Sequence, residues 1–205
     1  MASTDRLVWI DCEFTGLDTT RDALVEVACI VTDGELNPLG EGVSVVIAPP
    51  AEAVEGMDNF VRDMHTTSGL IHDWDSGLDM TTAQATVLAY VKEHTPEGKA
   101  PLAGNTVGMD KVFLQRDMPE LMAWLHYRVV DVSSIKELVR RWYPRVFFAS
   151  PEKHGGHRAL GDIRDSIQEL RYYRTTIFAP LPGPSSDEAK AAATHITEND
   201  SSAVT

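Results

Sequence analysis

The chain is poor in positive charge, in cysteine and in long apolar runs. Its 205 residues carry 18 Lys and Arg against 31 Asp and Glu, which gives a formal net charge of −13 at pH 7. Proteins that hold long nucleic acids neutralise many phosphates with Lys and Arg, so this charge balance argues against that mode of binding. It leaves open a short nucleic acid bound in a small local pocket or through metal ions.

Cysteine is scarce, and so are apolar segments of the length that a membrane span needs. The two cysteines, Cys12 and Cys29, each lie in an apolar run typical of a strand. They suit small buried side chains better than a disulfide framework, which indicates a reducing compartment. The N-terminus also lacks a basic segment followed by a long apolar stretch. We therefore expect a cytoplasmic protein with no membrane partner.

Apolar runs rich in β-branched residues open the chain, and helical patterns follow them. Strands are predicted at residues 7–11, 23–32, 42–47, 101–104 and 129–132. Helices are predicted at residues 52–64, 82–94, 111–127, 135–143 and 157–176, with Pro119 as a candidate break point in the third. A run of strands followed by strands that alternate with helices predicts an α/β fold, a mixed sheet flanked by helices. From Pro180 the composition turns polar and rich in Pro, Gly, Ser and Ala, so we expect one domain over residues 1–179 and a disordered tail over 180–205.

Two carboxylates close the first predicted strand. Asp11 and Glu13 are two residues apart, and side chains at that spacing project from the same face of a strand. Hard divalent cations bind to such groups of oxygen ligands. Acids also end many strands without binding metal, so the pair alone is a weak signal.

Further acids and a histidine stand at the ends of later elements. Asp110 follows an apolar strand through a loop of small residues, and a helix-terminal acid that interacts with the helix dipole is an equal alternative for it. His157 follows two glycines, and Asp162 lies five residues further on. Four clustered carboxylates would repel one another unless cations lay between them. Two divalent ions with a histidine that titrates near neutral pH suit in-line displacement at phosphorus.

The order Asp-x-Glu, Asp, His-x-x-x-x-Asp resembles that of the DEDDh branch of 3′–5′ exonucleases, which have a ribonuclease-H-like fold. Within that branch, residues 9–18 (Trp-Ile-Asp-Cys-Glu-Phe-Thr-Gly-Leu-Asp) are similar to the opening of the oligoribonucleases. Similar stretches follow at residues 65–70, 119–121, 126–128, 131–133, 136–138, 140–142 and 162–166. The resemblance covers residues 6–178 and implies a mixed five-stranded sheet whose first three strands are antiparallel.

The resemblance also implies a role for individual residues. Asp11, Glu13, Asp110 and Asp162 correspond to the carboxylates that bind two Mg²⁺ or Mn²⁺ ions, and His157 corresponds to the general base.

Other positions correspond to contacts with the substrate. Leu17 stands where the family inserts a leucine between two bases, Phe60 where relatives often stack a tryptophan on a base, and His65 at a further contact. Three residues correspond to a cap on the 5′ phosphate of a dinucleotide, with Thr106 in place of the usual serine: Thr106, Arg128 and Ser133. Tyr127 matches a tyrosine supplied by the partner subunit, which implies a homodimer.

The sequence thus predicts a metal-dependent 3′–5′ exoribonuclease that degrades short oligoribonucleotides, especially dinucleotides, to 5′-mononucleotides and does not bind long duplex DNA. Three alternatives compete with this interpretation. A related exonuclease acting on DNA is disfavoured by Arg128, Ser133 and the segment around His65. A phosphatase that opens with Asp-x-Asp is disfavoured because residue 13 is Glu. A non-catalytic RNA-binding module is disfavoured because all five residues of the pattern are present.

Overall fold

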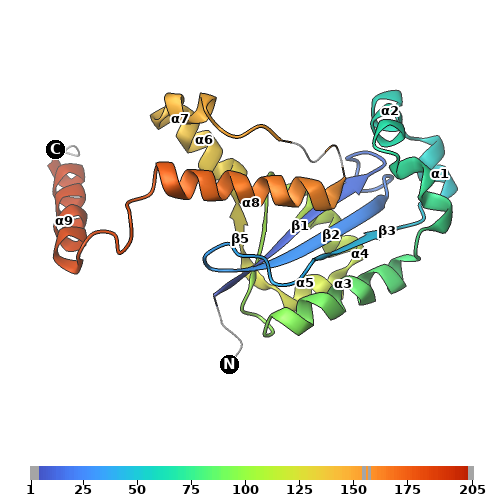
Figure 1. The fold of residues 1–205 in the computed structure, drawn as a ribbon, viewed down its shortest axis with the longest axis horizontal. Coiled ribbons are helices and arrows are strands. Elements are labelled where there is room, and N and C mark those ends of the chain that lie inside the picture. The colour runs from blue at the N-terminus through green and yellow to red at the C-terminus, as the bar shows by residue number, and fades with distance from the viewer. Residues whose placement is uncertain (1–4, 154–155, 157, 203–205) are drawn as a thin grey trace.

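A five-stranded mixed sheet forms the centre of the molecule (Figure 1). The computed structural model describes residues 5–153, 156 and 158–202, with side chains as far as residue 198. The strands are β1 (Arg6–Phe14), β2 (Leu24–Asp33), β3 (Val43–Val46), β4 (Pro101–Gly104) and β5 (His126–Asp131). They lie in the order β3-β2-β1-β4-β5; β1, β2 and β3 are antiparallel neighbours, whereas β4 and β5 run parallel to β1. The predicted mixed sheet with an antiparallel opening is confirmed.

Helices pack on both faces of this sheet, as Figure 1 shows. Between β3 and β4 lie α1 (Ala51–Glu55), α2 (Asn59–Thr67), the 3₁₀ turns η1 (Leu70–His72) and η2 (Trp74–Ser76), and α3 (Met80–His94). The later helices are α4 (Gly108–Asp117), α5 (Pro119–Trp124), α6 (Val132–Trp142), α7 (Pro144–Phe148), α8 (Ala159–Thr176) and α9 (Ser186–Ser202). Among the described helices, none has both the length and the apolar character that a membrane crossing requires.

Side chains alternate along β1 and divide the core into two layers. Val8, Ile10 and Cys12 belong to the layer that α3, α4 and α5 cover, whereas Trp9 belongs to the layer beneath α6 and α8. Because the strand period is two, the side chains that follow Trp9 on its face are those of Asp11 and Glu13. The alternation that builds the core therefore directs both carboxylates toward α8.

Helix α8 meets the sheet along one apolar stripe. Ile163, Ile167, Leu170 and Tyr173 are buried in the same layer as Trp9, at spacings of four, three and three residues. This stripe fixes the rotation of the helix about its axis. Asp162, in the first turn of α8, is thereby brought to the end of the sheet where β1 carries its acids.

Two predicted helices have different bounds in the structure. Residues 52–64 are not one helix: α1 ends at Glu55, and α2 begins after Asp58, whose side chain accepts a hydrogen bond from the Val61 N–H at 2.9 Å. The helix predicted for residues 111–127 is also wrong at its end. The candidate break at Pro119 is confirmed, because α4 ends at Asp117 and α5 begins at Pro119. The strand predicted at residues 129–132 begins earlier, at His126, since pairing of β5 with β4 outweighs helix propensity there.

The tail after α8 contains helix α9, which Figure 1 shows set apart from the sheet. Every described side chain of α9, up to residue 198, is exposed to solvent. A helix with no packed face relies on its own propensity, which is marginal for a segment of this length. The division into one domain over residues 1–179 and a disordered tail over 180–205 stays a prediction.

Candidate active site

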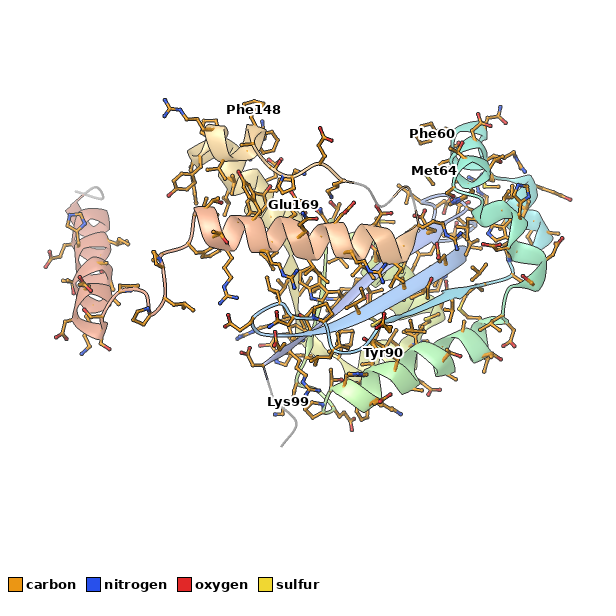
Figure 2. All side chains as sticks on the ribbon, in the orientation of Figure 1. Phe60, Met64, Tyr90, Lys99, Phe148 and Glu169 are labelled. Atoms are coloured by element: carbon orange, nitrogen blue, oxygen red, sulfur yellow. The ribbon has the colours of Figure 1, made fainter. Side chains whose placement is uncertain are left out.

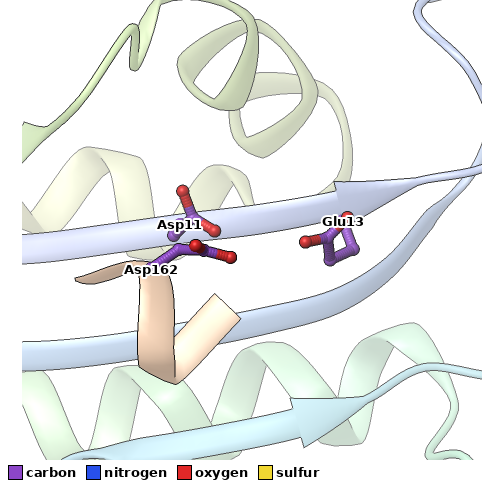
Figure 3. A group of neighbouring side chains, drawn as sticks. All are labelled: Asp11, Glu13 and Asp162. Atoms are coloured by element: carbon purple, nitrogen blue, oxygen red, sulfur yellow. The ribbon is translucent and has the colours of Figure 1, made fainter. Parts of the chain in front are cut away.

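Three of the predicted carboxylates meet at the end of β1. Asp11 and Glu13 from β1 and Asp162 from α8 each offer an oxygen, and these oxygens lie within 4.8 Å of one another. Figure 3 shows the three side chains together. Glu13 is buried, with an exposed fraction of 8%, and the other two are half-buried. Three oxygen ligands at this separation fit a hard divalent cation.

Asp110 lies beside this group and is attached to the same strand. Its Oδ1 accepts a hydrogen bond from the Cys12 N–H at 2.9 Å. Strand β4 ends at Gly104 and pairs with β1 only as far as Trp9, so none of the described strands pairs with the later part of this edge of β1. The Asp110 carboxylate, from the first turn of α4, takes the place of a ladder partner there and fixes the backbone between the two acids of β1.

Burial, with the charges of neighbouring carboxylates, raises the pKa values of these acids. Burial, and then the charges of Asp110 and Asp162, raise the pKa of Asp11 to about 9. Burial, and then the charges of Asp162 and Glu26, raise the pKa of Glu13 to about 8. Burial also raises the pKa of Asp110, to about 6, although backbone N–H donors that include Cys12 oppose it. The cluster is short of positive charge, which bound cations would supply.

Glu26 is a buried acid behind the site that the sequence analysis missed. It lies opposite Glu13 across the β1–β2 ladder and is 1% exposed. Its Oε2 lies 3.3 Å from Arg158 Nε and accepts the Ala159 N–H at 3.3 Å, while Oε1 accepts the Ser44 hydroxyl at 2.9 Å. Its position as a charged residue within an otherwise apolar predicted strand is the signal that could have identified it.

The predicted general base, His157, lies outside the described residues. The structure describes its neighbour Arg158, which forms ion pairs with both Glu26 and Asp73. Arg158 Nη1 lies 3.2 Å from Asp73 Oδ2. Arg158 is also the N-cap residue of α8. The start of α8 is therefore fastened to β2 and to the segment between η1 and η2.

A cavity of about 560 Å³ opens next to the carboxylates. Asp11 and Asp162 line it together with two of the predicted phosphate ligands, Thr106 and Ser133. The Asp131 carboxylate organises these two, because its Oδ1 accepts the Thr106 N–H at 2.9 Å, the Ser133 N–H at 2.9 Å and the Ser133 hydroxyl at 2.7 Å. Thr106 has a positive φ of 65°, and the bond to Asp131 holds it in that unfavourable conformation.

The predicted base-contacting residues lie near the end of β1, on the loop after it and on α2. Leu17 and Phe60 are exposed, with 65% and 78% of their surface accessible, and Figure 2 shows Phe60 on α2. His65 is fully buried, and its Nε2 lies 2.8 Å from the Phe14 carbonyl oxygen at the end of β1. In this structure His65 joins α2 to β1, and its contact with substrate stays a prediction.

Two other predicted residues are on the outer strand β5, and they do not line the cavity. Tyr127 is 76% exposed, and the Arg128 guanidinium lies 5.7 Å from the centre of its ring. Because β5 is an edge of the sheet, these side chains face solvent or a partner.

Comparison with known sequences agrees with this geometry. The exonuclease family model RNase_T matches residues 8–170. The chain is 63% identical to the oligoribonuclease of Streptomyces coelicolor over 194 residues, which cover 94% of this chain and 97% of the relative. It is 60% identical to the oligoribonuclease of Cutibacterium acnes, over 87% of this chain and 89% of the relative. The oligoribonuclease of Mycobacterium tuberculosis is 53% identical, over 95% of this chain and 91% of the relative.

Comparison with solved structures shows the same fold in longer proteins. Exonuclease I of Methylocaldum szegediense superposes with a TM-score of 0.61 at 22% identity, over 84% of this chain and 41% of that one. Metal-free exonuclease I of E. coli in complex with single-stranded DNA gives 0.66 at 16% identity, over 84% and 40%. The chain thus spans about two fifths of these exonucleases, and the likeness is one of fold.

Sheet topology, clustered carboxylates and the matched family model together define an exonuclease domain. The level of sequence identity to the oligoribonucleases, and the share of the chain over which it extends, narrow this class further. The chain belongs to the oligoribonuclease family and is a 3′–5′ exoribonuclease.

Proposed function

We propose that the protein hydrolyses very short oligoribonucleotides, down to dinucleotides, from the 3′ end to 5′-mononucleotides. The observation that carries this proposal is the cavity, which joins the carboxylate cluster to the Thr106 and Ser133 pair in a space of about 560 Å³. This volume lies within the range of small-molecule sites, so the cavity suits a short substrate. A small cavity also explains how a protein with a net charge of −13 could bind an RNA substrate, because a short substrate does not require a long basic groove.

Asp11, Glu13, Asp110 and Asp162 would hold two divalent cations, Mg²⁺ or Mn²⁺. The donor set fits, because carboxylate oxygens are the ligands that both ions prefer. Bound ions would supply positive charge to the attacking and leaving oxygens of an in-line displacement. The raised pKa values of Asp11 and Glu13 support this assignment, because protons held by the cluster without cations would be displaced by metal binding.

The hydrolytic step needs a base and a fixed phosphorus centre. We assign the base to His157, which would take a proton from the attacking water. The water oxygen bonds to phosphorus, the bond from phosphorus to the upstream 3′ oxygen breaks, and that oxygen takes up a proton. A dinucleotide with a 5′ phosphate then gives two 5′-mononucleotides.

The remaining predicted residues would bind the two nucleosides. Leu17 and Phe60 offer exposed apolar surface to the bases, and each stacked base is worth about 1–3 kcal/mol in related systems. His65 would contribute from the end of β1, and Thr106 and Ser133 would contact the 5′ phosphate within the cavity. Arg128 lies on β5 outside that cavity, and its contact with the 5′ phosphate stays a prediction from the resemblance.

We further propose a homodimer in which Tyr127 reaches the site of the other subunit. Exposed Tyr127 and Arg128 on the edge strand β5 support this assembly, since neither faces the cavity of its own chain. The free, buried thiols Cys12 and Cys29 are in keeping with action in the cytoplasm.

The proposal is tested with a 5′-phosphorylated diribonucleotide and a 5′-labelled RNA of about twenty nucleotides at equal concentration. With Mg²⁺ or Mn²⁺, the dinucleotide should disappear much faster than the long RNA, and a chelator should stop both reactions. Asp11→Ala should abolish activity, and His157→Ala should reduce it severely while metal binding persists. Equal or faster degradation of the long RNA would refute the short-substrate proposal, and a deoxyribonucleotide of the same sequence separates RNA from DNA preference.

A further inference from the structure

A buried carboxylate that the catalytic proposal does not use holds the loop between β1 and β2 from within. Asp22 is 4% exposed; its Oδ2 accepts the Asp18 N–H at 2.8 Å, and its Oδ1 accepts the Thr15 hydroxyl at 3.3 Å. A Cβ at Gly16 would lie 2.3 Å from Asp22 Oδ2, so only glycine lets the carboxylate reach these donors. The two bonds fall on either side of Leu17 and fix the backbone around it.

Leu17 depends on this loop for its position. Because 65% of its surface is exposed, the backbone that carries it, rather than packing in the core, decides where its side chain lies. A contact with substrate is stronger when the loop that makes it is already held in the bound conformation, since less conformational entropy is lost on binding. The groups that hold the loop therefore affect how well Leu17 can bind a base.

Arg116 of α4 holds the same loop from outside. Its Nη1 donates to the Thr19 carbonyl at 2.5 Å, and its Nη2 donates to the Asp22 carbonyl at 3.0 Å. On the helix side, Nε and Nη2 donate to the Asp117 carboxylate at 2.7 and 2.6 Å, and the guanidinium lies 4.6 Å from the centre of the Phe113 ring. Four of the five N–H groups of Arg116 are thus used within the chain, so this residue is suited to hold the loop rather than a substrate phosphate.

The helix that supplies this clamp also carries one of the acids of the cluster. Asp110, Phe113 and Arg116 follow one another at intervals of three residues, so they lie along one side of α4. Asp110 accepts the Cys12 N–H within β1, and the Phe113 ring centre lies 4.3 Å from that of Phe14 at the end of the strand. Arg116 then binds the loop beyond it. One helix therefore fixes the loop of Leu17 relative to the strand that carries the acids.

We propose that Arg116 and Asp22 are positioning residues that hold Leu17 where it separates the two bases of a dinucleotide. The inference rests on the proposed function and deepens it, because it assigns the base contact a support on the same helix as Asp110. Neither residue touches the substrate in this scheme, and both act through Leu17. Their effect should therefore appear only with substrates that offer two bases.

The test compares a 5′-phosphorylated diribonucleotide with the same molecule whose upstream ribose carries hydrogen in place of its base. Both substrates have the same phosphates and the same scissile bond, and only the first has two bases for Leu17 to separate. The values of kcat and KM are measured for each substrate with the full-length chain and Mg²⁺ or Mn²⁺. Wild-type protein should have the lower KM for the substrate with two bases.

Arg116→Ala should raise KM for the two-base substrate about fivefold to tenfold, because two charge-assisted hydrogen bonds to the loop are lost, and it should leave kcat within about twofold. Its KM for the abasic substrate should stay at the wild-type value. Arg116→Lys keeps the charge but not the fork that spans two carbonyls, so it should behave like Arg116→Ala. Asp22→Asn keeps a single acceptor oxygen and should raise the same KM. Arg174→Ala removes an equal charge that pairs with Glu35 at the surface of α8, and it should change neither KM.

A double-mutant cycle shows whether Arg116 acts through Leu17. Leu17→Ala with Arg116→Ala should raise KM for the two-base substrate no further than Leu17→Ala alone, whereas multiplied losses would overturn the proposal. Melting temperatures identify variants that do not fold, and Arg116→Gln replaces Arg116→Ala if that variant fails.

Three other results bear on the proposal. A folded Arg116 variant with the wild-type KM, or one that raises KM equally for both substrates, would overturn the positioning role. Wild-type protein with the same KM for both substrates would overturn it too, but cleavage of the diribonucleotide would leave the proposed function standing. Failure to cleave either substrate would refute the proposed function itself.

Discussion

Metal binding at neutral pH should release about two protons from the carboxylate cluster. The perturbation is titration of metal-free protein with Mg²⁺ or Mn²⁺ at pH 7. Before metal binds, burial and mutual repulsion hold the pKa of Asp11 at about 9, that of Glu13 at about 8 and that of Asp110 at about 6. A carboxylate must lose its proton before it can coordinate a metal ion, so binding expels what these groups hold.

The magnitude follows from the three pKa values. At pH 7, Asp11 is almost fully protonated, Glu13 is about nine-tenths protonated and Asp110 about one-tenth. The expected release is therefore about two protons per chain. At pH 9.5 the first two groups are mostly ionised already, and the release should fall well below one.

Calorimetry in two buffers of the same pH and different ionisation enthalpy measures this number directly. The slope of the observed binding enthalpy against the buffer enthalpy equals the number of protons released. Glu13→Gln should lower the slope by about one, and Glu93→Gln, an exposed acid on α3, should leave it unchanged. Saturable metal binding with a slope near zero at pH 7 would show that the cluster is ionised without metal, and the electrostatic argument would fail.

Three further predictions concern stability and base binding. Without metal, the raised pKa of Asp11 means that the folded state holds a proton the unfolded state loses, so the free energy of unfolding falls as pH rises from about 4 to about 9. Asp11→Asn should therefore have a higher melting temperature than wild type at pH 9 and a similar one at pH 4. Equal melting temperatures at pH 9 would contradict this. Trp9 is fully buried, and its indole Nε1 donates to Thr32 Oγ1 at 3.0 Å. Trp9→Ala should lower the free energy of unfolding, measured by urea denaturation, by about 3–5 kcal/mol, and a loss below about 1 kcal/mol would contradict the placement of Trp9 in the core. Phe60→Ala should raise KM for a diribonucleotide at least fivefold while Phe60→Trp lowers it or leaves it unchanged, and an unaltered KM in Phe60→Ala would remove this ring from the site.

Residues 7–11 and 101–104 were predictable as strands because a central sheet needs continuous apolar runs. The acids of β1 were predictable for the same reason, since only the period of two is required to place Asp11 and Glu13 on one face. The break before Pro119 was predictable from the proline itself. The start of β5 at His126 was less accessible, because pairing between β4 and β5 decides it. Local sequence carries little information about such non-local pairing.

The least predictable parts of the site were the groups that support it. Glu26, Glu169 and Asp131 each bind partners that are distant in sequence, with separations of up to 133 residues for the bond between Glu26 and Ala159. A motif lists the residues that touch substrate or metal, whereas their supports emerge only when the chain is folded. Lys136 was within a recognised stretch, yet nothing in the sequence showed that it and Lys153 both form ion pairs with Glu169.

Asp162 and the buried Glu169 lie seven residues apart, close to two turns of α8, and this interval makes the helix sensitive to length as well as to composition. A single inserted residue between them would rotate Glu169 by about 100° and move it away from Lys136 and Lys153, its ion-pair partners. The same insertion would separate Asp162 from the apolar stripe by the same rotation. Turning the helix could then restore the packing of the stripe or the position of Asp162, but not both at once. Point substitutions on the solvent side of α8 can accumulate freely, but insertions and deletions within this interval should be absent from active members of the family. The described side chains of α9, in the tail after α8, are all exposed, so insertions there would displace no packed residue of the domain.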